Sequence, residues 1–412
     1  MARALSANRT KLLSDAAGDW SMTSGGVSNS TPPPSAALPG ASWVLKRFAV
    51  FLSVAQSILL LGHYFLFETV VHAWGIADRG IQLKLGVALA DLSMSFLSAS
   101  ALAFKYCNIV LRSVYRGAAV WLGTFNFLFM AACAWWVVFG ALSLAKVSFS
   151  TRALAAGLFG AALATSLYGL VNAAWTRVKR ITVQLAALPE SWHGRTIALV
   201  SDLHLGNVRG ARFVRKIVRL IARENPAMVI IAGDLFDGTP LDAERAAAPL
   251  RELRAPLGAF FAEGNHEEFS NPARFLKAIE KAGVRALDNE TVDVDGLQLI
   301  GVPYRHATHT EHFRSVLAKL GIDRTRASLL ITHAPDHPHV AEQAGISLQV
   351  SGHTHLGQMF PYTRIATRIY RQFVYGLTRI GGLQVYTSSG AGTWGPPLRV
   401  GSASEIVIIR LE

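Results

Sequence analysis

The stretch SLQVSGHTHLGQ, residues 347–358, joins the end of an apolar run to a glycine-flanked turn that holds two histidines. Side chains along an extended strand point alternately to opposite faces, so His353 and His355 can serve one site only where the chain bends. Gly352 permits such a bend. The pattern predicts a buried strand and, after it, a turn whose two imidazoles reach two neighbouring metal ions.

Apolar runs of strand length recur through the C-terminal half of the chain. Together with 347–353, these runs lie at 196–202, 227–234, 258–265, 297–302 and 327–333. Amphipathic helical patterns lie between several of them, at 211–224, 242–254 and 272–282. Buried strands alternating with helices predict an α/β domain whose central sheets are covered by helices.

Polar side chains follow five of these runs at the point where each strand should end. They are Asp202 and His204, Asp234 and Asp237, Asn265, His266 and Glu267, His333, and finally His353 and His355. In open α/β sheets the ligand crevice lies at the carboxyl ends of the strands, so we expect these side chains to converge. Carboxylate, amide and imidazole ligands without cysteine favour a pair of divalent ions such as Mn, Fe or Zn over a structural zinc site.

The N-terminal half has the composition of a membrane region. The chain of 412 residues is 51% hydrophobic and 16% charged, whereas soluble domains average about 25% charged residues. Apolar stretches at 48–67, 85–104, 118–142 and 153–175 are long enough to cross a bilayer. We therefore predict a disordered tail over 1–45, a transmembrane region of about four helices over 46–180 and a catalytic domain over 181–412.

Most of the net positive charge lies in residues 1–180, which contain the apolar stretches. Residues 1–180 carry 15 Lys and Arg against 5 Asp and Glu, a balance of +10, which leaves +3 of the total +13 for the rest of the chain. This distribution indicates a lipid bilayer as partner and gives no reason to expect nucleic acid. Basic residues in the loops number eight on the side of the C-terminal domain and four on the other side, which places that domain in the cytoplasm.

Four polar or aromatic residues within the spans have both a structural and a functional interpretation. His63 and Asp91 either belong to a proton or ion path or are packed inside the helical region, and we favour packing. Trp135 and Trp136 are expected to pack or to lie near an interface rather than to bind a ligand.

Five blocks in the C-terminal half carry a family resemblance. SDLHL, GDLFDG, GNHEE, ITHAPDH and SGHTHLGQ, in this order over 196–358, closely resemble the calcineurin-like metallophosphoesterases. The closing segment TSSGAGTWGPPLRVGSASEIVIIRL is similar to the membrane-associated bacterial branch of that family. The resemblance implies a four-layer α/β/β/α sandwich with two mixed sheets, following the four transmembrane helices.

The resemblance also implies a role for each polar residue. Asp202, His204 and His355 would hold a first metal ion, Asn265, His333 and His353 a second, and Asp234 would bridge both. His266, oriented by Asp237, would protonate the leaving oxygen. Two ions so placed lower the pKa of a water and neutralise charge on the phosphoryl oxygens, so no covalent nucleophile is required.

Other segments leave two interpretations open. The segment 362–379 is expected to begin as a short helix with apolar and basic stripes, and it either rests on the bilayer or forms a lid on its own domain. On the first interpretation Arg364, Arg368 and Arg371 would contact substrate. His306, His309 and His312 suit a solvated loop better than substrate contact, and Glu267 and Glu268 either support the GNH loop or face solvent.

These patterns predict a membrane-anchored dimetal hydrolase in the bacterial inner membrane with a cytoplasmic catalytic domain. Its substrate would be a phosphoester or pyrophosphate of a lipid-linked molecule, because anchoring raises the effective concentration at the bilayer. The resemblance to the membrane-associated branch implies an acylated UDP-sugar as one such molecule. The alternatives are a tethered phosphodiesterase of soluble nucleotides and a noncatalytic membrane scaffold with a metal-binding domain.

Overall fold

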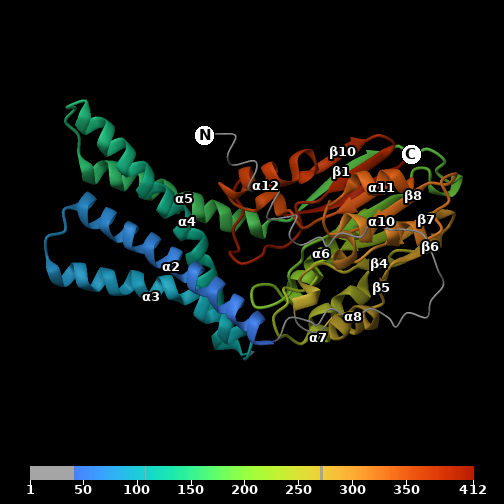
Figure 1. Cartoon of the computed structure of the whole chain (residues 1–412), viewed down its shortest axis with the longest axis horizontal. Coiled ribbons are helices and arrows are strands. Elements are labelled where there is room, and N and C mark those ends of the chain that lie inside the picture. The colour runs from blue at the N-terminus through green and yellow to red at the C-terminus, as the bar shows by residue number, and fades with distance from the viewer. Residues whose placement is uncertain (1–40, 107, 270–271) are drawn as a thin grey trace, which may run out of the picture. The chain divides into compact units, whose positions relative to one another are not determined.

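The computed structural model describes residues 41–106, 108–269 and 272–412 (Figure 1). Leu52–Glu412 forms one compact unit, and the residues before it belong to a second unit. The tail predicted over 1–45 falls mainly outside the described residues, while 41–45 are already part of the first helix.

Four long helices precede the α/β domain, as the sequence predicts. They are α2 (Ala41–Trp74), α3 (Arg79–Ala103), α4 (Ile109–Leu144) and α5 (Thr151–Ala174). Length and composition allow all four to cross a membrane, α2 over Leu52–Trp74. Asp78, Asn108 and Ser150 cap α3, α4 and α5 by accepting a hydrogen bond from a backbone N–H of the first turn. These caps place the starts of α3 and α4 several residues before the most apolar part of each helix.

His63, Trp135 and Trp136 pack within the helical bundle. His63 is buried, accepts a hydrogen bond at Nε2 from the Trp121 indole (3.0 Å) and lies 2.7 Å through Nδ1 from the Leu59 carbonyl oxygen. A neutral imidazole with its proton on Nδ1 satisfies both contacts. Trp135 is fully buried, and the Trp136 indole donates to Thr69. These contacts favour the structural interpretation of His63, Trp135 and Trp136. Asp91, by contrast, is exposed on α3, so the packing that we favoured for it is not found.

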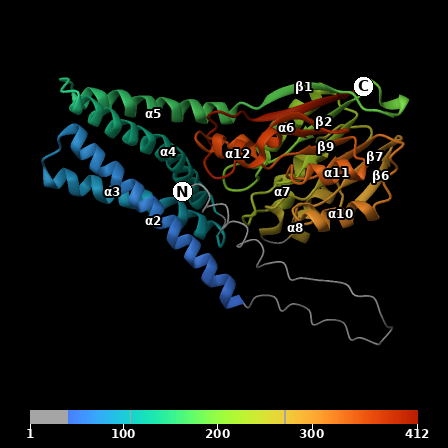
Figure 2. The same cartoon turned by 45° about the horizontal axis from the view of Figure 1, so that its top comes forward.

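The α/β domain contains two six-stranded sheets (Figures 1 and 2). The first has the order β1 (Arg177–Val183), β12 (Glu405–Leu411), β2 (Thr196–Val200), β3 (Met228–Ala232), β4 (Ala259–Ala262), β5 (Arg285–Ala286). The second has the order β10 (Gly376–Ile380), β11 (Leu383–Thr387), β9 (Leu348–Ser351), β8 (Ser328–Ile331), β7 (Leu297–Gly301), β6 (Glu290–Val294). Both sheets mix parallel and antiparallel pairs, so the predicted two mixed sheets are confirmed.

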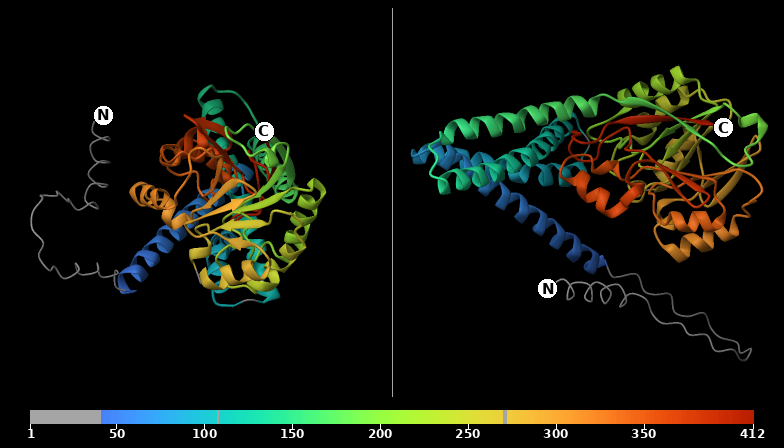
Figure 3. Two further views of the ribbon diagram at one scale, coloured as in Figure 1. Left: turned by 90° about the vertical axis from the view of Figure 1, so that its right-hand side faces the viewer. Right: turned by 90° about the horizontal axis from the view of Figure 1, so that it is seen from above.

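Successive side chains of a strand point to opposite faces of its sheet, so each strand contributes to two different cores. In β2, Ile197 and Leu199 join the core between the sheets, whereas Ala198 and Val200 face a second core on the helical side. That second core contains residues of α6 (Ala211–Glu224), α7 (Ala243–Ala247) and α8 (Pro272–Lys281). A third core packs α10 (Thr310–Lys319) and α11 (Pro338–Ala344) on the other sheet (Figure 3). The layers are therefore helix, sheet, sheet, helix.

The helix predicted over 242–254 changes type part of the way along. The α-helix α7 ends at Ala247, and a 3-10 helix continues over Ala248–Glu252. Pro249 lacks the backbone N–H that an α-helix would need at this position, which accounts for the change.

The α/β domain follows the bundle with almost no linker. Helix α5 ends at Ala174 and β1 begins at Arg177, in parallel register with β12 (Figures 2 and 3). The buried Asn172 side chain donates to the carbonyl oxygens of Arg399 (2.9 Å) and Ser402 (2.8 Å). Leu398 is fully buried in the core of the bundle itself. These contacts join the C-terminal loop of the α/β domain to the spanning helices.

Candidate metal centre

The polar residues that follow the strand ends meet at one edge of the two sheets. Asp202 and His204 follow β2, Asp234 follows β3, Asn265 and His266 follow β4, His333 follows β8, and His353 and His355 follow β9. Five of them have a positive backbone φ, namely Asp202 (53°), His204 (48°), Asp234 (50°), His353 (69°) and His355 (48°). Non-glycine residues rarely adopt this conformation, and such strain gathers at functional sites.

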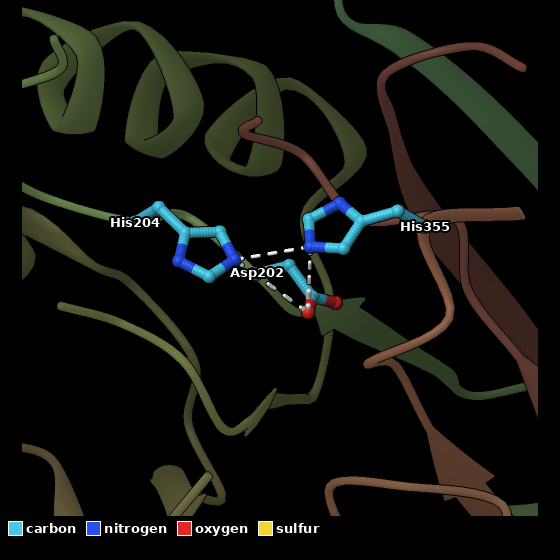
Figure 4. A group of neighbouring side chains, drawn as sticks. All are labelled: Asp202, His204 and His355. Atoms are coloured by element: carbon cyan, nitrogen blue, oxygen red, sulfur yellow. Dashed lines mark hydrogen bonds and ion pairs between the residues drawn. The ribbon is translucent and has the colours of Figure 1, made fainter. Parts of the chain in front are cut away.

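Asp202, His204 and His355 form the first cluster of ligand atoms (Figure 4). The Nε2 atoms of His204 and His355 are 3.0 Å apart, and His355 Nε2 is 3.4 Å from Asp202 Oδ1. Burial lowers the pKa of both imidazoles well below its usual value and raises the pKa of the Asp202 carboxyl to about 6. Neutral imidazoles have a free lone pair on one ring nitrogen, which is the form that binds metal.

Asp234, His333 and His353 form the second cluster. His333 Nε2 lies 3.1 Å from Asp234 Oδ2 and 3.1 Å from His353 Nδ1, while Asn265 Oδ1 lies 3.0 Å from His353 Nδ1. The Ala232 carbonyl oxygen lies 2.8 Å from His333 Nδ1 and accepts a hydrogen bond from Nδ1–H, which turns Nε2 toward the site.

The Asp234 carboxylate lies between the two clusters. Its Oδ2 atom is 3.7 Å from His204 Nε2 in addition to its short contact with His333. Burial opposes charge on both partners, yet the carboxylate raises the pKa of His333 to about 10 and His333 lowers the pKa of Asp234. A divalent cation would replace the His333 proton as the positive charge that faces Asp234.

The donor atoms fit a pair of divalent ions. Ligand atoms about 2.0–2.2 Å from one ion lie about 3 to 4 Å from one another, and the separations within both clusters fall in this range. Three of the four histidines, His204, His353 and His355, have a lowered pKa and offer uncharged nitrogens. The donors are imidazole nitrogens and carboxylate or amide oxygens, which suit Mn, Fe or Zn.

His266 lies beside these clusters, with Nε2 3.9 Å from Asp234 Oδ2. Its Nδ1 atom is 3.1 Å from the backbone carbonyl oxygen of Asp237. The Asp237 carboxylate accepts hydrogen bonds from the backbone and hydroxyl of Thr239. Asp237 therefore contacts the ring through its main chain, a detail that residue spacing alone does not give.

Close backbone packing around the ligands depends on glycine at two places. A Cβ atom on Gly352 would lie 2.3 Å from Asp202 Oδ2, and one on Gly390, where φ is 82°, would lie 2.7 Å from Asp202 Cβ. The turn of the GHTH motif and the loop after β11 can thus both approach Asp202 only without a side chain.

Glu267 supports the loops that carry Asp234 and Asn265. It is fully buried, and its carboxylate accepts hydrogen bonds from the backbone N–H groups of Asp234 (3.0 Å), Phe236 (3.0 Å) and Gly264 (2.8 Å). Burial raises its pKa to about 8. Of the two interpretations given for Glu267, support of the GNH loop is the one that these contacts favour.

Arg399 is a residue of the site that sequence reasoning missed. Its fully buried guanidinium lies 3.2 Å from His355 Nδ1 and donates to the carbonyl oxygens of Ser389 (2.6 Å) and Gly392 (2.8 Å). Burial lowers its pKa to about 9. The only sequence signal was its place inside the closing segment TSSGAGTWGPPLRVGSASE.

The metal-ligand residues open onto a cavity of about 1100 Å³. Asp234, Asn265, His266, His353 and His355 line part of it, and side chains of α2 and α4 line another part. The cavity thus connects the candidate metal centre with the membrane-spanning helices.

The segment 362–379 contributes aromatic residues to this cavity. Helix α12 covers Tyr362–Tyr370, a 3-10 turn covers Arg371–Val374, and the rest forms β10. Arg371, at φ 52°, ends the helix. Tyr362 and Tyr370 line the cavity, while the side chains of Arg364, Arg368 and Arg371 are exposed and are absent from its lining.

The histidines of 304–312 lie away from the two clusters of ligand atoms. His309 and His312 are exposed, and His306 contacts the Asn289 side chain and, edge to face, the ring of His312. Tyr304, by contrast, places its ring 5.4 Å from the ring of His353. This tyrosine, which no sequence motif singles out, lies next to the second cluster.

A family model, two relatives and one solved structure match parts of this chain. A family model described as calcineurin-like phosphoesterase matches residues 195–357. A zebrafish (Danio rerio) transmembrane protein with metallophosphoesterase domain is 30% identical over 400 residues, covering 88% of this chain and 89% of that one. A metallophosphoesterase of Campylobacter jejuni is 32% identical over 252 residues, or 60% of this chain and 66% of its own length. A solved 5′-nucleotidase precursor from Thermus thermophilus aligns with a TM-score of 0.32 and 17% identity, covering 52% of this chain and 54% of that one.

Proposed function

Because the chain belongs to the calcineurin-like metallophosphoesterases, a family of metal-dependent hydrolases, we propose that it cleaves a phosphoester or pyrophosphate bond of a lipid-linked substrate. The observation that carries the substrate class is the cavity shared by the metal-ligand residues and the spanning helices. A substrate with a phosphate at one end and an apolar chain at the other matches such a cavity. An acylated UDP-sugar is one molecule of this kind.

In this proposal the two clusters and the bridging carboxylate hold two divalent ions. Asp202, His204 and His355 would hold the first ion and Asn265, His333 and His353 the second, with the Asp234 carboxylate between the two sets of ligand atoms. When bound, the ions supply Lewis-acid activation of a water and neutralise charge on the phosphoryl oxygens. Arg399 and Glu267 keep the ligand loops in position through their backbone contacts.

His266 is the proton donor to the leaving oxygen. Its ring lines the cavity, and the Asp237 carbonyl oxygen lies 3.1 Å from Nδ1. In the protonated ring, Nδ1–H donates to this carbonyl while Nε2 carries the second proton toward the site. Release of that proton avoids the departure of an unprotonated alkoxide or phosphate.

We also propose that the protein lies in the bacterial inner membrane with its catalytic domain in the cytoplasm. The support is the excess of loop Lys and Arg on the side of the C-terminal domain, eight against four. Four spans place the N-terminus and this domain on the same side of the membrane.

The test uses the full chain in lipid nanodiscs, stripped of metal by a chelator and then reloaded with Mn, Fe or Zn. Substrates are an acylated UDP-sugar, a soluble nucleotide diester and a soluble aryl phosphate. We expect activity to return with metal and kcat/KM to be highest for the lipid-linked substrate. A preference for the nucleotide would make the protein a tethered phosphodiesterase, and failure to cleave any substrate with any of the metals would make it a noncatalytic scaffold.

A further inference from the structure

The cavity next to the metal centre extends along the middle of two spanning helices. Its walls include Gly62 and Phe65 of α2, and Leu122, Phe125, Phe129 and Cys133 of α4. Cys133 lies eleven positions after Leu122, which corresponds to about 16 Å along a helix axis. This length is about half of the roughly 30 Å hydrocarbon core of a bilayer, or the depth of one leaflet.

The wall formed by α2 and α4 is held in place by large side chains. Phe125 stacks on His63 with a ring separation of 3.8 Å, and His63 is held by Trp121 and by the Leu59 carbonyl. A Cβ atom on Gly62 would lie 2.8 Å from Phe125 Cζ, so the glycine lets this ring approach α2. The Asn126 amide, a polar group in the wall, donates to the Phe360 carbonyl oxygen (3.0 Å). Apart from Asn126, whose amide is hydrogen-bonded, the lining between the helices is therefore apolar and preformed.

The cavity also reaches the outer surface of the bundle. Ile58 and Leu61 line it, yet they are 65% and 68% exposed, and Phe129 on the other helix is 36% exposed. These residues lie within candidate spans, so in a bilayer the surface they share with the cavity would face lipid. A chain of apolar groups can thus pass sideways between α2 and α4.

We propose that the space between α2 and α4 is a seat for one acyl chain of a membrane lipid, which enters from the side while its phosphate lies at the metal centre. This inference rests on the proposed function for the phosphate end and adds the place and the route of the apolar end. An acyl chain makes no hydrogen bonds, so apolar walls suit it, whereas a peptide or nucleotide would leave polar groups unpaired there.

The first experiment locates the chain without relying on hydrolysis. Full-length Asp234→Asn protein in nanodiscs receives a phosphatidic acid with a photoreactive diazirine near the end of one acyl chain. After illumination, we expect adducts on the peptides that contain 58–65 and 122–133, and an excess of unlabelled phosphatidic acid should suppress them. Adducts only on peptides outside these two, or adducts that unlabelled lipid does not suppress, would overturn the proposal.

The second experiment places a bulky side chain at the end of the seat that lies farthest along α4. Cys133→Trp shortens the space, and Val137→Trp, which introduces the same side chain at a 72% exposed site four residues further along α4, is the matched control. For the Cys133 variant we expect the ratio of kcat/KM on a long-chain phosphatidic acid to that on an aryl phosphate to fall about tenfold, because a few methylene groups lose their apolar surroundings. An equal ratio in both variants would argue against the seat.

These outcomes separate the seat from the hydrolytic activity. Suppressible crosslinks at both helices in a chain that hydrolyses nothing would support the seat and refute the proposed function. Hydrolysis of aryl phosphate by a chain whose crosslinks all lie elsewhere would support the activity and refute the seat.

Discussion

At the scale of single residues, the Asp234 carboxylate faces ligand atoms of both clusters, so we expect its substitution to disturb the candidate centre most. We expect Asp234→Asn to lower kcat on an aryl phosphate by more than about 100-fold, since even the loss of an outer-shell partner costs 10- to 100-fold. The assay should be paired with metal analysis of the purified protein. Full activity after both this substitution and chelation would refute the mechanism.

Glu267 acts through the backbone rather than through a ligand atom. In Glu267→Gln, the amide would bring N–H donors against backbone N–H groups that now find a carboxylate. We expect a loss of about 1–3 kcal/mol in the free energy of unfolding and weaker metal binding, because buried donors lose their acceptors. Thermal unfolding in detergent and metal titration measure both effects. Glu252→Gln, at an exposed position, is the control and should change neither.

At the scale of elements, one side of α12 lines the cavity and another side is exposed to the surroundings. Tyr362 and Tyr370 line the cavity, whereas Ile365 and Ile369 are exposed beside the arginines. Exposed isoleucines next to basic side chains favour contact with a bilayer over packing of this stripe on the domain. That the arginines contribute to substrate capture remains a prediction.

The arginine prediction is tested by the triple variant Arg364→Ala, Arg368→Ala, Arg371→Ala. Each basic residue near an anionic bilayer contributes about 1 kcal/mol, so binding of the catalytic domain to the membrane surface should weaken appreciably. We expect a lower kcat/KM on a lipid-borne phosphoester with little change on a soluble aryl phosphate. Equal losses on both substrates would place these arginines in phosphate binding or folding, and no loss on either would leave the segment a structural lid.

At the scale of the whole molecule, the bundle and the α/β domain share one hydrophobic core at their contact. Gly123 of α4 and Gly169 of α5 face Leu398, where a Cβ atom on Gly123 would lie 2.6 Å from its Cδ1. The domain is therefore held against the spanning helices by packing as well as by chain connection.

Orientation of the whole chain is tested by a reporter fused after Glu412. Four spans and the excess of basic residues beside the C-terminal domain predict a signal from a cytoplasmic reporter such as green fluorescent protein. Alkaline phosphatase fused at the same point should be inactive. An active phosphatase fusion would mean that the span count or the orientation is wrong.

Much of the fold could be predicted from the sequence because it follows local periodicity. Continuous apolar runs predicted β2, β3, β4, β7, β8 and β9, and the four long stretches predicted the spans. The convergence of Asp202, Asp234, His333 and His353 was also predictable, since strands of an α/β sheet bring their carboxyl ends to one edge. In each case the spacing along the chain and the regular geometry of the element were sufficient.

The tertiary structure alone decided which distant surfaces meet. The cavity between α2 and α4, the approach of Arg399 to His355 and the bond from Asn126 to Phe360 join residues that no periodic pattern relates. Periodicity tells which face of a helix is apolar, but the partner of that face depends on the packing of side chains far apart in sequence. The sequence by itself thus indicated half of the strands, the four long helices, the candidate ligand residues and their common edge, while packing decided that this edge opens toward α2 and α4.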